Sequence, residues 1–152
     1  MQAPKKLEGI VRGLHHVAIA VESLAEARKA YEGALGLAAS QIELVEDQKV
    51  NVLVLYAGLQ RIELVEPASA DSPISGFLAK RGGGIHHLAW TVEDIAGAIA
   101  KLKSKGVRMI DETPRPGAHG TRIAFVHPKS TGGVLMELVE DAPDGQDLAE
   151  SR

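Results

Sequence analysis

The chain has 152 residues, of which 45% are hydrophobic, 24% are charged and only 3% are aromatic. This length suits one compact domain or two small ones, and the composition predicts a folded chain with an aliphatic core. A net charge of -3 argues against a general nucleic-acid binder and against a protein that binds anionic membranes. The absence of cysteine excludes disulfide frameworks, zinc ribbons, thiol nucleophiles and iron–sulfur clusters.

The two ends of the chain contain no pattern that predicts an export signal or an anchor. Residues 1–9 are polar, and no apolar run in the sequence approaches the roughly 20 residues of a membrane span. We therefore expect a soluble, cytoplasmic protein. Residues 141–152 are acidic and offer little to bury, so we expect them to form a flexible tail.

Two internal repeats organise the rest of the sequence. Residues 14–22 read LHHVAIAVE, and residues 85–93, which lie 71 positions later, read IHHLAWTVE. Residues 62–66 (IELVE) return 74 positions later as residues 136–140 (MELVE). Duplication of one small module accounts for this pattern. We place the first repeat at about 14–66, a linker at 67–84 and the second repeat at about 85–140.

The first repeat predicts the element order β-α-β-β-β. Alternation over 15–21 indicates a strand. Ser23 and Glu26 match a capping box that starts a helix over 24–35, and Gly36 follows where this helix should end. Strands are expected at about 38–45, 50–57 and 60–66.

The linker and the second repeat continue in the same way. In the linker, Asp71-Ser72-Pro73 predicts the start of a short helix, with Pro73 at its first position, that ends at the glycine run 82–84. The second repeat predicts a strand at 86–92 and a helix from 95 to about 105, with Asp94 as its N-cap. Strands follow near 107–112, 121–127 and 133–140. We expect a single domain over residues 1–152, composed of two tandem βαβββ modules.

The alternation also predicts which side chains share a face. Bulky residues alternate with small ones in the opening strands, so we expect the bulky face to pack on the helices and the small-residue face to line the concave side of the sheet. His15 and His86 fall on the helix-facing side, and we assign them a structural role. Four polar residues fall on the concave side, in equivalent positions of the two repeats: His16 with Glu63, and His87 with Glu137.

Two imidazoles and two carboxylates that face one cleft indicate a metal site. Taken singly, each residue is more often a core histidine or a solvated glutamate. The matched positions in the two repeats favour ligation of one divalent ion per chain. Nitrogen and oxygen ligands without thiolate suit Fe, Mn, Co, Ni or Zn, and the sequence does not distinguish among these metals. Open positions on such an ion would accept substrate oxygens.

The motifs around these residues resemble those of the vicinal oxygen chelate superfamily. That group includes glyoxalase I, extradiol dioxygenases, fosfomycin-resistance enzymes and metal-free bleomycin-binding proteins, so the fold alone does not choose a function. Within it, the chain resembles the methylmalonyl-CoA epimerase family in detail. The segments that carry this resemblance are HHVAIAV at 15–21, DSPISGFL at 71–78, GGGIHHLAW at 82–90, GAHG at 117–120 and HPKSTGGVLMEL at 127–138.

The resemblance implies a fold, a ligand set and a reaction. The implied fold is α+β, with a curved, mostly antiparallel sheet around a metal-binding cleft. The implied reaction is the metal-dependent epimerisation of (2R)- and (2S)-methylmalonyl-CoA through a metal-stabilised enolate, a step of propionate metabolism. An acyl-CoA is the expected partner. Exposed strand edges in each repeat separately favour a homodimer. Carried over onto this sequence, the family's metal ligands are His16, Glu63, His87 and Glu137.

The resemblance also suggests roles for individual residues around the ligands. Glu137 is our candidate base. His119 and Gly120 lie in a loop that we expect to close on the acyl group, and Lys129 is a candidate for binding the CoA phosphates. Some epimerases carry a second glutamate as a base in the third strand, where this chain has Val52. An acid or amide from residues 46–48 (Glu-Asp-Gln) is a candidate replacement.

Two other functions of the same fold remain open. A glyoxalase I-type lactoylglutathione lyase uses the same types of ligand, and Glu63 favours it because some epimerases have glutamine at this position. A metal-free drug-binding protein needs no ligand set, so the four filled ligand positions argue against it. The GAHG and HPKSTGG segments favour the epimerase over both.

Overall fold

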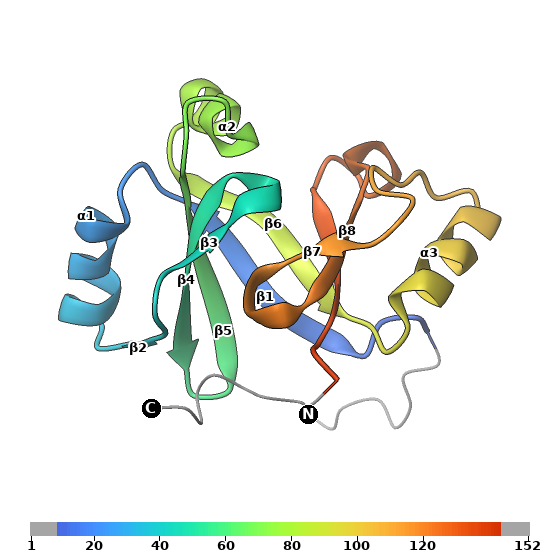
Figure 1. Ribbon diagram of the computed structural model, residues 1–152, viewed down its shortest axis with the longest axis horizontal. Helices are drawn as coiled ribbons and strands as arrows, with labels where there is room; N and C mark the ends of the chain where they lie inside the picture. Colours follow the sequence, from blue (N-terminus) through green and yellow to red (C-terminus); the bar gives the residue numbers. More distant parts are fainter. Residues whose placement is uncertain (1–8, 144–152) are drawn as a thin grey trace.

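The computed structural model describes residues 9–143, which form one mixed sheet of nine strands with helices packed outside it (Figure 1). The strand order is β2-β4-β5-β1-β6-β9-β8-β7, and β3 pairs with β4. The pairs β1/β5 and β6/β9 are parallel, and the other pairs are antiparallel. The predicted α+β class with a mostly antiparallel sheet is therefore confirmed.

The first repeat builds one half of the sheet. Its opening elements are β1 (Gly13–Ala20), α1 (Leu24–Arg28) and a π-helical continuation, η1 (Lys29–Ala34). Short strands β2 (Ala38–Ala39) and β3 (Glu43–Val45) follow, with the 3-10 turn η2 (Glu46–Gln48). The half closes with the long strands β4 (Val50–Ala57) and β5 (Gln60–Pro67).

The second repeat builds the other half after the linker helix α2 (Pro73–Arg81). Its opening elements are β6 (Gly84–Thr91) and α3 (Ile95–Ser104). The short strand β7 (Arg115–Pro116) and the 3-10 turn η3 (Ala118–Gly120) come next. The half closes with β8 (Arg122–Val126), the turn η4 (Pro128–Ser130) and β9 (Met136–Glu140).

Side-chain caps set the starts of the three α-helices, and the caps of α1 and α3 are those predicted. Ser23 Oγ accepts a hydrogen bond from the backbone N–H of Glu26, and Ser72 Oγ accepts one from Ile74. Asp94 Oδ1 accepts one from Gly97. Each bond satisfies an N–H group that has no partner inside its helix. Among the described residues, no helix is both long enough and apolar enough to span a membrane.

The strand predicted over 107–112 is not formed. This segment makes a single bridge, from Met109 to Val126. The ladder stops there because the N–H groups of Ile110 and Asp111 both donate to the carbonyl of Phe125, at 2.9 and 3.2 Å. The Asp111 carboxylate in turn accepts the N–H of Phe125 at 2.8 Å. A side chain thus takes the place of a backbone carbonyl, and regular pairing ends.

The bulky faces of the strands pack on the helices, as predicted. Ile19, Val21 and Leu64 pack with α1, and Leu138 packs with Ile95 of α3. Burial of these aliphatic side chains supplies the main stabilisation of each half. Small residues line the centre of the opposite, concave face. They are Ala18, Ala20 and Ala89, and all three are fully buried.

The two halves are joined in one chain by the antiparallel pair β1/β6 at the centre of the sheet. Their loops also meet: in Figure 1 the β3–η2 segment faces the β7–η3 segment in front of the central strands. His119 N–H donates to Glu43 Oε2 at 2.8 Å, and Arg115 Nη1 lies 3.1 Å from Asp47 Oδ2. Each half therefore covers part of the concave face of the other.

Candidate metal centre

The register of the four central strands brings the candidate ligands onto one face. Each candidate histidine pairs with an alanine of the other repeat on the neighbouring strand. On the next strand beyond, a candidate glutamate pairs with the same alanine. The two rows are His16–Ala89–Glu137 and His87–Ala18–Glu63. Because a methyl group stands between each imidazole and carboxylate, the longer side chains can reach toward one another above it.

Three of the four candidate ligands converge. Glu137 Oε1 lies 3.5 Å from His16 Nε2, and Glu137 Oε2 lies 3.6 Å from His87 Nε2. The ligand atoms of these three residues are all within 4.8 Å of one another. Glu63 lies at the other edge of the His16 ring, with Oε2 3.1 Å from Nδ1. It therefore lines the same cavity without joining the group of three.

The converging groups line a cavity with a volume of about 30 Å³, enough for an ion or one or two waters. Its walls come from both repeats and combine polar with apolar side chains. The apolar ones include Val45, Val50, Val52, Val65, Ile123 and Val139. The exposed fractions of His16, His87 and Glu137 are 3%, 5% and 4%. Interactions between charges in this site are therefore poorly screened by solvent.

Burial shifts the pKa values of all four groups toward their neutral forms. Burial raises the pKa of Glu63 from its ordinary value of 4.5 to about 7, although nearby Arg61 acts in the opposite direction. Burial and then the charge of Glu63 raise the pKa of Glu137 well above its usual range. Burial lowers the pKa of His16, and it lowers that of His87 to about 3. The imidazoles are therefore neutral and free to act as ligands.

The chemistry of these groups fits a divalent metal ion. Nε2 of His16 and Nε2 of His87 are both buried, and neither makes a hydrogen bond within the described part of the chain. Buried polar atoms without partners are rare and costly, and both nitrogens face Glu137. Neutral imidazole and carboxylate are the donors that borderline divalent ions prefer. A cation would also relieve the cost of ionising the buried carboxylates.

The prediction that His15 faces the helices is wrong. Leu14 pairs with Trp90 and His16 with Ala89, so His15 is the extra residue of a β-bulge. A bulge breaks the strict alternation of side chains on which the prediction rested. His15 therefore turns to the cavity side, where its Nδ1 lies 2.8 Å from Nδ1 of His16.

The second repeat contains the matching bulge at His86. Ala18 pairs with His87 and Ile19 with Ile85, which leaves His86 as the extra residue. Its Nδ1 lies 2.8 Å from that of His87. The His86 ring, however, packs edge-on against Phe77 of α2 at a centroid distance of 4.8 Å and does not line the cavity. His86 thus contacts a helix, as predicted, in spite of the bulge.

The residues predicted to bind substrate lie around the cavity rather than in its lining. His119 and Gly120 belong to η3, and their neighbours Gly117, Ala118 and Thr121 line the cavity. The backbone of His119 is in the left-handed region, with φ of 61°, and this conformation presents its N–H to Glu43. Lys129 is exposed on η4 and does not line the cavity.

The tail prediction covers residues of two kinds. Residues 144–152 lie outside the described residues. Asp141, in contrast, is held at the site, since its Oδ1 lies 2.9 Å from His15 Nε2. This hydrogen bond lowers the pKa of Asp141.

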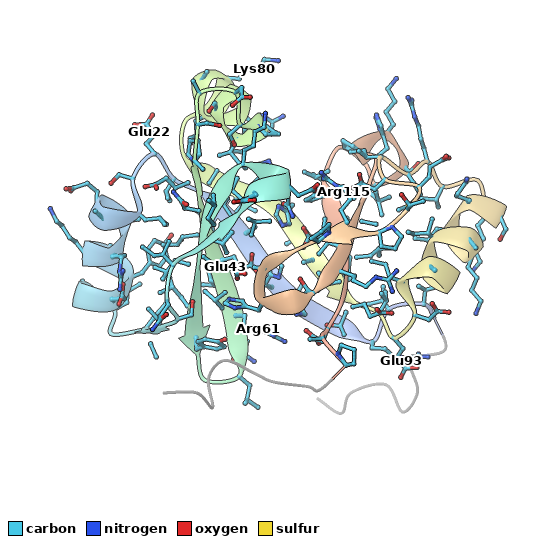
Figure 2. The ribbon with its side chains drawn as sticks, viewed as in Figure 1. Glu22, Glu43, Arg61, Lys80, Glu93 and Arg115 are labelled. Carbon is cyan, nitrogen blue, oxygen red and sulfur yellow. The ribbon has the colours of Figure 1, made fainter. Side chains whose placement is uncertain are left out.

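Arg61 also lies at the site, and sequence reasoning missed it. It precedes Glu63 by two residues in β5 and therefore points to the same face. Its charge acts on the pKa values of His16, Glu63 and Asp141. Within residues 9–143, the Arg61 side chain makes no hydrogen bond or ion pair. Figure 2 shows Glu43, Arg61 and Arg115 toward the middle of the molecule, with Glu22, Lys80 and Glu93 at its periphery.

Glu43 is a second residue that the sequence did not single out. It lies directly opposite Val52 in the β3/β4 pair, so the two side chains share a face. Glu43 therefore stands beside the position where some epimerases carry a second glutamate. Of the residues proposed as replacements, Asp47 pairs with Arg115, while Gln48 lines the cavity and donates to the carbonyl of Pro116 at 3.3 Å.

Comparison with known proteins agrees with this geometry. The family model of the glyoxalase/bleomycin resistance protein/dioxygenase superfamily matches residues 15–125. The uncharacterized protein YqjC of Bacillus subtilis is 47% identical over 131 residues, which are 86% of this chain and 94% of the relative. An ethylmalonyl-CoA/methylmalonyl-CoA epimerase of Cereibacter sphaeroides is 42% identical over 127 residues, which are 82% of this chain and 95% of the relative.

Solved structures show the same similarity. The crystal structure of methylmalonyl-CoA epimerase from Mycobacterium tuberculosis superposes with a TM-score of 0.87 at 41% identity, and the match covers 91% of this chain and 94% of that one. A methylmalonyl-CoA epimerase in complex with methylmalonyl-CoA and NH4+ superposes with a TM-score of 0.83 at 34% identity, covering 88% and 96% of the two chains.

Proposed function

The chain belongs to the glyoxalase/bleomycin resistance protein/dioxygenase superfamily, and within it we propose that the protein is a methylmalonyl-CoA epimerase. The observation that carries this proposal is the buried group of His16, His87 and Glu137, whose two unpartnered nitrogens face one carboxylate. Relatives with this activity at about 42% identity over most of both chains support it.

We propose that His16, Glu63, His87 and Glu137 hold one divalent ion per chain. When bound, such an ion stabilises the negative charge that develops on a thioester oxygen as the neighbouring α-proton leaves. The four side chains leave the choice among Co, Mn, Ni, Zn and Fe open, because all of these accept nitrogen and oxygen ligands.

Glu137 is the proposed base that removes the α-proton. Burial raises the pKa of Glu137, so its ionised form is a stronger base than an exposed carboxylate, and a bound cation would favour that ionised form. The valine walls keep bulk water away from the proton it holds. Epimerisation also needs a group that returns the proton to the opposite face. Glu43 is our candidate, because it shares a face with Val52, which lines the cavity, and its side chain is 39% exposed.

The acyl-CoA partner requires the loops over the cavity to open. A volume of about 30 Å³ admits an ion but not an acyl group. We propose that η3, with His119 and Gly120, moves away from β3 to admit the substrate and then closes over it. We further propose that Lys129 contacts the CoA phosphates, and that the protein is a single-domain, cytoplasmic homodimer.

Arg61 is the proposed partner of the free carboxylate of the substrate. Its guanidinium makes no hydrogen bond or ion pair within residues 9–143, lies on the ligand face of β5 and suits bidentate binding of a carboxylate. We expect Arg61→Gln to raise the KM for methylmalonyl-CoA by roughly 10- to 100-fold, since a hydrogen bond to a charged group contributes about 1.5–3 kcal/mol. Inhibition by propionyl-CoA, which lacks the carboxylate, should change little.

Steady-state kinetics with propionyl-CoA as a competitive inhibitor measure both quantities. Arg122→Gln is the matched control, because Arg122 lies on β8 in an exposed ion pair with Glu140. Equal weakening of both ligands in Arg61→Gln would contradict a role in binding the carboxylate.

Exchange of the α-hydrogen tests the proposed function itself. Metal-loaded protein is incubated with methylmalonyl-CoA in D2O, and the α-hydrogen is followed by NMR beside a chelator-treated sample. We expect deuterium uptake that depends on the metal. Absence of exchange in protein that has bound metal would reject the epimerase and favour the glyoxalase I-type alternative, for which glutathione hemithioacetals are the substrates to test next. Protein that binds no metal would favour the drug-binding alternative.

A further inference from the structure

A chain of hydrogen-bonding groups leads from the surface to the candidate metal centre. It begins at Asp141, whose side chain is 46% exposed, and passes to His15, whose side chain is 5% exposed. Asp141 Oδ1 lies 2.9 Å from His15 Nε2, and His15 Nδ1 lies 2.8 Å from His16 Nδ1. The β-bulge at His15 creates this chain, because it turns two consecutive side chains to the same side of β1.

The direction of each hydrogen bond follows from what the groups can donate. An ionised carboxylate only accepts, so the hydrogen between Asp141 and His15 belongs to His15 Nε2. A neutral imidazole carries one hydrogen, and in His15 that hydrogen is the one on Nε2. His15 Nδ1 is then an acceptor, so the hydrogen between the two rings belongs to His16 Nδ1. A neutral His16 with its hydrogen on Nδ1 has a bare lone pair on Nε2.

The lone pair on His16 Nε2 is directed to the side of the ring where the other candidate ligands lie. His16 Nε2 faces Glu137 and is the nitrogen that makes no hydrogen bond among the described residues. We infer that Asp141 and His15 are positioning residues, which hold His16 in the tautomer whose Nε2 can bind the ion. This inference rests on the proposed metal site but not on the identity of the substrate.

Glu63 acts in the same direction. Its Oε2 lies 3.1 Å from His16 Nδ1, so a hydrogen on that nitrogen also faces a carboxylate oxygen. Two acceptors therefore lie around Nδ1 of His16. A partner on the outer nitrogen of a metal-binding histidine fixes both its tautomer and its ring orientation.

The second repeat offers a built-in comparison. His86 and His87 make the same 2.8 Å contact between their Nδ1 atoms. The residue that occupies the place of Asp141 in the first repeat, however, is Pro67, which lies 74 positions earlier and has no carboxylate. The His86 ring packs on Phe77 instead. Within residues 9–143, a series of hydrogen bonds from a carboxylate to a candidate ligand therefore exists only for His16.

Nitrogen-15 NMR of the metal-free protein tests this inference directly, because long-range couplings distinguish the two imidazole tautomers. We expect wild-type His16 to carry its hydrogen on Nδ1 and Asp141→Ala to contain a mixture of tautomers. Titration with Co2+ or Zn2+ should show metal affinity reduced by about 10- to 100-fold in Asp141→Ala, the range typical of lost partners of metal ligands. Asp141→Asn, which retains an acceptor oxygen, should recover most of the affinity.

His86→Gln is the control for the tautomer and should leave that of His16 unchanged. Glu112→Ala, which removes an exposed carboxylate paired with Lys103, is the control for metal affinity and should leave it unchanged. A purely structural role for Asp141 would change the thermal stability of the variants without moving the tautomer. The inference is overturned if wild-type His16 carries its hydrogen on Nε2, and this result does not require any variant to fold. It is also overturned if folded Asp141→Ala keeps both the wild-type tautomer and the wild-type affinity.

The two proposals fail in distinguishable ways. Wild-type protein that binds no divalent ion would reject the metal site, whereas the tautomer measurement in metal-free protein would still decide whether Asp141 and His15 act on His16. Wild-type protein that binds metal but does not exchange the α-hydrogen would reject the epimerase and leave the positioning role standing.

Discussion

Glu137→Gln is expected to slow exchange of the substrate α-hydrogen by roughly 100- to 10,000-fold, the range typical for loss of a general base. The amide has nearly the same size as the carboxyl group but cannot take up a proton at neutral pH. It also gives the two facing histidines one carbonyl oxygen in place of two carboxylate oxygens, which lie 3.5 and 3.6 Å from their Nε2 atoms. NMR in D2O measures the rate, and Glu112→Gln, in an exposed ion pair with Lys103, is the control.

Metal analysis of the same variant separates the two roles of Glu137. Loss of exchange with the metal retained would support a role as base. Loss of both would assign Glu137 to metal binding, and the base would then have to be sought elsewhere, with Glu43 as the first candidate. Metal retained together with wild-type exchange would contradict both roles.

In the metal-free protein, Glu63→Gln is expected to raise the free energy of unfolding by about 3 kcal/mol at about pH 8. The reason is that burial raises the pKa of Glu63 to about 7 in the folded state, from an ordinary value of 4.5. Between these two values the folded chain retains a proton that the unfolded chain has lost. The wild type therefore loses stability as the pH rises through this window, and the loss is complete above about pH 7.

Urea unfolding at about pH 4.5 and about pH 8 measures this difference. Near the lower pH the two proteins should have similar stability, because a protonated Glu63 and a glutamine are both neutral. Saturating divalent metal should reverse the order at the higher pH, since the wild type gains binding energy, about 4 kcal/mol when the free metal is 1,000 times the Kd. A stability difference that does not vary with pH in the metal-free proteins would contradict the raised pKa.

Both predictions concern residues that the sequence placed correctly on one face. His16, His87, Glu63 and Glu137 stand at alternating positions of strands that bury bulky residues on the other side, and the duplication repeats this pattern. A side chain's face depends on local backbone geometry, so it can be predicted from neighbours in the sequence. The caps Ser23, Ser72 and Asp94 were predictable for the same reason, because each acts within its own first turn of helix.

The errors in the sequence-based prediction arose where the local rule was interrupted. Each bulge depends on how β1 and β6 align with each other, and neither LHHVAIAVE nor IHHLAWTVE contains a local signal that predicts it. His15 was therefore assigned to the wrong face. The strand expected over 107–112 failed in a similar way, because the Asp111 side chain competes for the N–H of Phe125, a residue that lies 14 positions away.

The sequence by itself determined the duplication, the order of the elements apart from the strand expected over 107–112, the four candidate ligands and the resemblance that points to an epimerase. These features depend on spacing and residue type along the chain. Only the tertiary structure decided that the two repeats pair through β1 and β6 within one chain, that Asp141 reaches His15, and that Arg61 and Glu43 join the site. These contacts join residues that are distant in sequence, and they are set by strand register and packing across the whole sheet.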